Sequence, residues 1–129
     1  EAVRNADELA FVMGHEASHP ILAHLEQTRQ SAMVGAVVFS GIAAISGATP
    51  DEIRTAEQYG AAAGARAYSK EFELQADQLG TVIAARSGFD PVRGAAFFTR
   101  LPDPGNRFLG SHPPNEARIR IVKQTAAGL

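Results

Sequence analysis

Residues 15–19, His-Glu-Ala-Ser-His, constrain this chain more than any other segment, because they place two imidazoles four residues apart with a carboxylate between them. Residues four apart lie on one face of an α-helix. Two neutral imidazoles on that face can bind one Zn²⁺ ion, and the carboxylate of Glu16 can accept a proton from a water molecule on the metal. The spacing therefore predicts a helix that carries part of a zinc site. The alternative is a chance pair of histidines on a solvated helix.

The residues before this segment predict that the helix has a defined start and an apolar side. Asn5 is a typical N-cap residue, and Glu8 follows three positions later, as in a variant of the capping box. Apolar side chains then recur at helical spacing, at Leu9, Val12 and Met13.

A second segment, residues 69–77, contains the candidate for a third zinc ligand. Glu73 and Asp77 are four residues apart, so they share one face of a second predicted helix. A zinc ion held by two histidines needs a third protein ligand and usually keeps one position for water. Glu73 could bind the metal while Asp77 holds a ligand histidine by its other ring nitrogen. The alternative is a charged outer helix face, and the spacing alone does not decide between the two.

Three segments together resemble the family of zinc metallopeptidases that includes HtpX, the CaaX prenyl protease and BepA. They are residues 8–19, running on to His24, then residues 68–80 and residues 111–119. They occur in the family's order and extend over nearly the whole chain. The resemblance implies a mainly α, zincin-like metallopeptidase core of the gluzincin type, with the zinc between two helices.

The resemblance also assigns roles to individual residues. It implies that the zinc ligands are His15, His19 and Glu73, with Glu16 as the general base. It implies that Asp77 supports a ligand histidine, and that His112 reaches the metal or the reacting carbonyl from a mobile loop with Arg118 nearby. A histidine before two prolines is otherwise most often a solvated loop residue, so that alternative for His112 stays open.

Three residues depart from the family pattern without removing a ligand. Ser18 stands where an apolar residue or alanine is usual, and Lys70 stands where arginine is more common. Pro20 follows His19 directly, cannot donate to the carbonyl of Glu16 and crowds that turn, so we expect a kink just beyond the metal-binding face.

His24 needs a separate interpretation. It lies nine residues after His15, which is two and a half turns along a continuous helix, and would therefore point to the opposite side. On that register it cannot share the metal, and we interpret it as structural or exposed.

Composition favours a single domain over residues 1–129, with a formal charge of −2 and no cysteine. It offers no basic surface for nucleic acid, no disulfide framework and no thiolate metal site. The chain begins at Glu1 without a signal peptide, so we expect it to be a piece of a longer protein. We find no strand pattern, and expect that the upstream substrate-pairing strand of the family is missing.

Residues 31–48 are rich in alanine, valine, isoleucine and glycine. A helix that spans a membrane needs about 20 apolar residues. The run of residues 32–45 is shorter and contains Ser40 and Gly41, so we favour a buried or membrane-touching helix over a spanning one.

The remaining elements are predicted from helix start and stop signals. Thr49 and Pro50 begin one helix, and Gly88 ends the helix of Glu73. Another helix begins at residues 90–91 and should turn three side chains to the core: Phe97, Phe98 and Leu101. A loop over residues 101–106 then leads to His112, and residues 113–114 open a terminal helix.

These observations favour a zinc-dependent endopeptidase that acts on unfolded or extended polypeptide, in protein quality control. A different class is a proteolytically weak or inactive zinc-binding helical domain that acts as a chaperone or interaction module. A third is a metal-free helical domain with a decayed site. The resemblance further implies a periplasmic or membrane-associated place in the cell envelope, with association at a membrane surface.

Overall fold

The computed structural model describes residues 3–129, and the described part is helical with no strand. The elements in chain order are α1 (Ala6–Ile21), α2 (His24–Ile45), α3 (Pro50–Arg66), α4 (Ser69–Arg86), α5 (Pro91–Gly94), the 3₁₀ helix η1 (Ala95–Arg100) and α6 (Asn115–Ala127). The mainly α class predicted from the sequence is confirmed.

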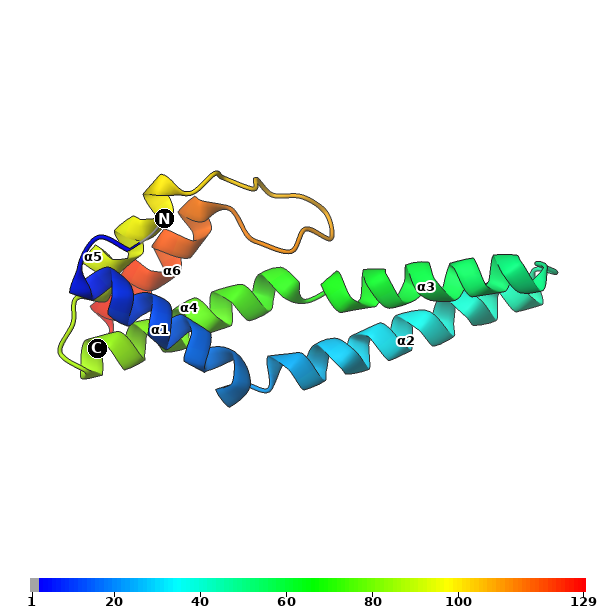
Figure 1. The fold of residues 1–129 in the computed structure, drawn as a ribbon, viewed down its shortest axis with the longest axis horizontal. Helices are drawn as coiled ribbons and strands as arrows, with labels where there is room; N and C mark the ends of the chain where they lie inside the picture. The colour runs from blue at the N-terminus through cyan, green and yellow to red at the C-terminus, as the bar shows by residue number, and fades with distance from the viewer. Residues whose placement is uncertain (1–2) are drawn as a thin grey trace.

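The helices form two parts (Figure 1). α1, α4, α5, η1 and α6 pack into a body, and α2 and α3 form a long antiparallel hairpin that projects from it. The chain leaves the body after α1 and returns to it with α4, so the hairpin is an insertion between the two helices that carry the predicted metal ligands (Figure 1).

The helix boundaries follow the predicted signals closely. The Asn5 side chain accepts a hydrogen bond from the Glu8 N–H, and Thr49 forms a full capping box with Glu52. Gly88 has φ +90°, a conformation that favours glycine and ends α4. Pro20 lies in the last turn of α1, which ends at Ile21. The expected kink is therefore a helix end.

The core of the body is a small apolar cluster. Phe11 of α1 meets Phe98 of η1 edge to face, with ring centroids 5.7 Å apart, and Ala95 and Val122 complete the cluster. Phe97 packs against this cluster and is partly buried. Leu101 was predicted to face the core and does not: it is 37% exposed, because η1 ends at Arg100 and the chain turns away into a loop.

The two helices of the hairpin approach each other through small residues. A Cβ on Gly35 would overlap the carbonyl of Gly60, and one on Gly64 would overlap the carbonyl of Ser31. Small residues in α2 and α3 thus allow the two backbones to pack closely.

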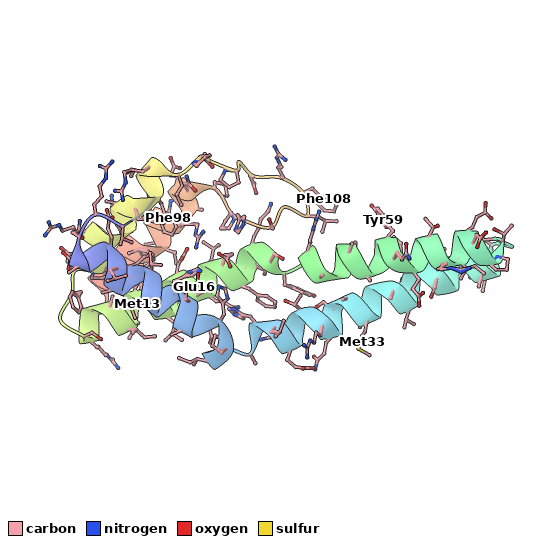
Figure 2. All side chains as sticks on the ribbon, in the orientation of Figure 1. Met13, Glu16, Met33, Tyr59, Phe98 and Phe108 are labelled. Carbon is pink, nitrogen blue, oxygen red and sulfur yellow. The ribbon has the colours of Figure 1, made fainter. Side chains whose placement is uncertain are left out.

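The apolar run of α2 was predicted to be buried or to touch a membrane, and the structure excludes the first of these two alternatives. Within α2 only His24 is buried, while Met33 is 67% and Ile45 87% exposed. Met33 and Tyr59 project from opposite sides of the hairpin (Figure 2). α3 covers one side of α2 and no other described element packs along its length, so the apolar side chains remain outside. Among the described residues α2 is also the one helix whose length and composition would suit a membrane span.

Candidate metal centre

Three side chains from two helices converge on one point. His15 and His19 lie one turn apart on α1, with their Nε2 atoms 3.2 Å apart. Glu73 of α4 places one oxygen 3.5 Å from His15 Nε2 and the other 3.2 Å from His19 Nε2. Ligand atoms at the corners of a tetrahedron around zinc lie about 3.3 Å apart, given Zn–N distances of about 2.0–2.1 Å. Two imidazoles and a carboxylate at this spacing fit a zinc ion.

Two glycines allow α1 and α4 to come this close. A Cβ on Gly80 would lie 2.7 Å from the backbone nitrogen of His15, and one on Gly14 would lie 2.9 Å from the carbonyl oxygen of Gly80. The importance of neither glycine was predicted from the sequence. The signal was a glycine directly before His15 and another one turn beyond Asp77.

His15 is held from behind by a buried ion pair. Its Nδ1 lies 2.8 Å from Asp77 Oδ1, and Asp77 is fully buried. Arg118 of α6 donates to both oxygens of Asp77, at 2.7 and 2.8 Å, and lies 3.2 Å from Glu73 Oε1. The structure thus brings the predicted supporting residues Asp77 and Arg118 to the predicted ligands.

These contacts set the charge of the site. Burial lowers the pKa of His15, but its hydrogen bonds to Asp77 and Glu73 outweigh burial and raise the pKa to about 9. A metal ion that binds Nε2 must therefore displace a proton, so we expect metal affinity to rise with pH.

Glu16 lies on α1 beside the ligands, and its side chain is exposed (Figure 2). Its negative charge acts on His19, where it opposes the lowering of the pKa by burial. An exposed carboxylate next to the ligand face is accessible to water and to a substrate.

His112 lies at the rim of the site. Its Nδ1 is 3.9 Å from Glu73 Oε1, and its side chain is 58% exposed. It belongs to the loop between η1 and α6, which Lys70 anchors to α4 by donating to Asn106 Oδ1 and to the Arg107 carbonyl. Lys70 is thus a loop anchor, which the sequence did not indicate.

The structure also shows where two further residues singled out from the sequence, Ser18 and His24, lie. Ser18 is fully buried, and its hydroxyl donates to the Gly14 carbonyl at 2.7 Å, so a polar residue is accommodated there. The helical register of α1 does not extend to His24, contrary to the prediction, because α1 ends at Ile21 and Ala23, with φ 57°, redirects the chain. His24 is buried and contacts His19, and does not belong to the group formed by His15, His19 and Glu73.

The profile of peptidase family M48 matches residues 1–126. The chain belongs to peptidase family M48. It is 31% identical over 136 residues to the beta-barrel assembly-enhancing protease of Escherichia coli, covering 95% of this chain and 28% of that protein. It is 33% identical over 127 residues to the putative beta-barrel assembly-enhancing protease of Vibrio cholerae, covering 86% of this chain and 24% of that protein.

A more distant relative is the mitochondrial metalloendopeptidase OMA1 of Arabidopsis thaliana, 25% identical over 121 residues, which cover 91% of this chain and 24% of that protein. The chain thus spans about a quarter of the length of these relatives. No solved structure matches the chain. Family membership confirms the resemblance seen in the three sequence segments and supports a metalloprotease, a hydrolase of peptide bonds.

Proposed function

We propose that this chain is the catalytic domain of a zinc-dependent endopeptidase. The observation that carries the proposal is the convergence of His15, His19 and Glu73 from two helices at the ligand spacing of a tetrahedral zinc site. A zinc ion held there would act as a Lewis acid and lower the pKa of a water molecule toward about 7.

We assign the other catalytic roles to side chains of this chain. Glu16 accepts the proton of the attacking water and passes it to the leaving amine nitrogen. Asp77 and Arg118 hold the ring of His15 in one orientation. The proposed role of His112, which lies at the rim, is either to stabilise the developing oxyanion or to close the site at rest, and its 3.9 Å distance from Glu73 Oε1 supports a role at the site.

Replacing Glu16 tests the chemistry. Glu16→Gln keeps the shape of the side chain and removes the base, so we expect zinc to remain bound while cleavage of casein by the zinc-loaded protein is lost. Glu26→Gln, an exposed change on α2, is the matched control and should cleave like the parent. Unchanged turnover in Glu16→Gln would exclude Glu16 as the base.

The competing function is a zinc-binding chaperone or interaction module with weak or no proteolysis. It is favoured by the lack of a strand in residues 3–129, because extended peptides gain much of their affinity by pairing with a sheet edge. Stoichiometric zinc together with suppressed aggregation of an unfolded protein, and no casein cleavage, would support it. EDTA-sensitive cleavage would support the endopeptidase.

The proposed substrate is an extended polypeptide with apolar side chains. A groove of about 750 Å³ runs between the hairpin and the start of α4, and its apolar lining includes Val34, Val38, Tyr68, Phe72 and Leu109. Phe72 also lines a second hollow beside His19 and Glu73, so this side chain lies between the groove and the metal centre. Peptides with an apolar residue beside the cleaved bond should therefore be cleaved faster than charged ones.

We also propose that the hairpin touches a membrane surface, in keeping with a place in the cell envelope. Outside the groove, the exposed side chains of α2 include Met33, Val37, Ile42 and Ile45, which are apolar and uncharged, and they lie on a helix that projects from the body (Figure 1). Co-sedimentation with phosphatidylcholine vesicles tests this. Binding should be lost in a Val37→Glu/Ile42→Glu variant that still binds zinc.

A further inference from the structure

His24 is a buried histidine next to the metal centre, and both of its ring nitrogens are hydrogen-bonded. It is the first residue of α2 and only 4% exposed. Its Nδ1 lies 2.9 Å from His19 Nδ1, and its Nε2 lies 2.9 Å from Gln75 Oε1 on α4. Its ring stacks on Phe72 with centroids 4.4 Å apart and an interplanar angle of 13°. Both ring nitrogens of His24 therefore have a partner, and the ring plane is held by a neighbour.

The chemistry of these contacts allows one direction of hydrogen bonding. A ring that gives the lone pair of Nε2 to a metal carries its proton on Nδ1. His19 Nδ1–H must then donate, so His24 Nδ1 has to accept. The proton of a neutral His24 consequently sits on Nε2, where the Gln75 Oε1 atom accepts it.

We propose that His24 and Gln75 are positioning residues that orient the metal-binding ring of His19, with protons running from His19 Nδ1 to His24 Nδ1 and from His24 Nε2 to Gln75. This inference rests on the zinc site proposed above. In this arrangement the two ligand histidines have different hydrogen-bond acceptors at Nδ1. His15 is backed by the carboxylate of Asp77, and His19 by a neutral imidazole that adds no negative charge to the site.

The first measurement is the tautomer of His24 in the zinc-loaded protein, from two-bond ¹⁵N–¹H correlations of ¹⁵N-histidine. We expect a proton on Nε2 and none on Nδ1 of His24, and a proton on Nδ1 of His19. The opposite tautomer of His24 would overturn the proposal. This readout uses the unmodified protein and does not depend on activity or on the folding of a variant.

The second measurement is zinc affinity by competition with a chromophoric chelator. His24→Phe keeps an aromatic ring against Phe72 but removes the acceptor, and should weaken zinc binding by about 10- to 100-fold. His24→Asn offers an amide oxygen near the position of Nδ1 and should restore most of the affinity. Glu26→Gln, an exposed change on the same helix and outside the hollow at the metal centre, is the control and should match the parent.

The outcomes separate this inference from the zinc site itself. Parental affinity in a folded His24→Phe variant would overturn the positioning role and leave the zinc site intact. Equal weakening in His24→Phe and His24→Asn would also overturn it, because the acceptor would then not matter. No zinc binding by the parent protein, measured beside His15→Ala, would overturn the zinc site and this inference with it.

Discussion

In the proposed zinc site, the carboxylate of Glu73 lies against both imidazoles. Burial raises its pKa, but the hydrogen bond to His15 and the charge of Arg118 outweigh burial and lower it below the usual value. The carboxylate is therefore ionised at neutral pH and ready to serve as the anionic ligand between two imidazoles. Its neighbours Glu71 and Gln75 are exposed residues on the same helix.

Removing this carboxylate should abolish stoichiometric zinc. Glu73→Ala leaves two imidazoles, which are too few for a stable site, and His15→Ala should have the same effect. Zinc content after purification without chelators measures this, with Glu71→Ala as the control that retains one zinc per chain. If Glu73→Ala kept full affinity, the third ligand would lie elsewhere, and His112 would be the next candidate.

His112 should reveal its role by the sign of its effect. We expect His112→Ala to increase proteolysis, because the side chain lies at the rim of the site, 3.9 Å from Glu73 Oε1, where it would compete with a substrate. A fall in kcat of up to about 10²–10³-fold with zinc retained would instead assign it to oxyanion stabilisation. Steady-state cleavage of a fluorogenic peptide distinguishes the two roles. An unchanged rate would show that His112 is a solvated loop residue with no role in catalysis.

At the scale of helices, the crossing of α1 and α4 brings the ligands together. Gly14 and Gly80 meet backbone to backbone, so the axes approach more closely than side chains would allow. His15 follows Gly14 directly, which means that the position of its ring depends on this contact.

Gly80→Ala should therefore disturb both stability and metal binding. The added Cβ would lie 2.7 Å from the backbone nitrogen of His15, which cannot yield without moving α1. We expect a loss of about 1–3 kcal/mol in the free energy of unfolding, as for overpacked cores, together with weaker zinc binding. Urea denaturation and zinc competition measure the two effects. Gln78→Ala, exposed on the same helix, should change neither, and full zinc affinity in Gly80→Ala would show that the crossing tolerates the methyl group.

At the scale of the whole molecule, a buried ion pair ties the start of the chain to η1. The Glu8 carboxylate is 2% exposed and accepts two hydrogen bonds from Arg100, at 2.7 and 2.8 Å, and one from the Arg4 N–H. Glu8 thus belongs to the capping region of α1, as its position suggested, but its side chain reaches a partner 92 residues away.

This pair should make folding sensitive to acid. Hydrogen bonding to Arg100 lowers the pKa of Glu8 from 4.5 to about 2 against the opposing effect of burial. A carboxyl whose pKa is lower in the folded state stabilises the fold above its unfolded pKa, and this stabilisation is lost as pH falls from about 4.5 to about 2. Thermal melts across that range should show a smaller loss of Tm in Glu8→Gln than in the parent. Glu57→Gln, exposed on α3, should keep the parental profile, and equal profiles for Glu8→Gln and the parent would contradict this assignment.

The sequence by itself determined the features that depend on local geometry, namely which residues share a helix face and where the helices begin and end. Helical pitch places His15 beside His19 and Glu73 beside Asp77, and local capping and backbone conformation begin and end the helices at Asn5, Thr49 and Gly88. These features require only a few neighbouring residues, so the ligand types and the helical class could be predicted without knowing how the helices pack. The family resemblance joined the two segments into one site.

Only the tertiary structure decided how the helices meet. The Gly14–Gly80 contact, the return of His24 toward His19 and the reach of Arg100 to Glu8 each depend on packing between distant segments. Composition alone could not decide whether α2 is exposed. A helix buried in a protein and a helix in contact with a membrane can have the same apolar composition. A helical register extrapolated through Pro20 failed for His24 because one left-handed residue, Ala23, redirects the whole chain after it.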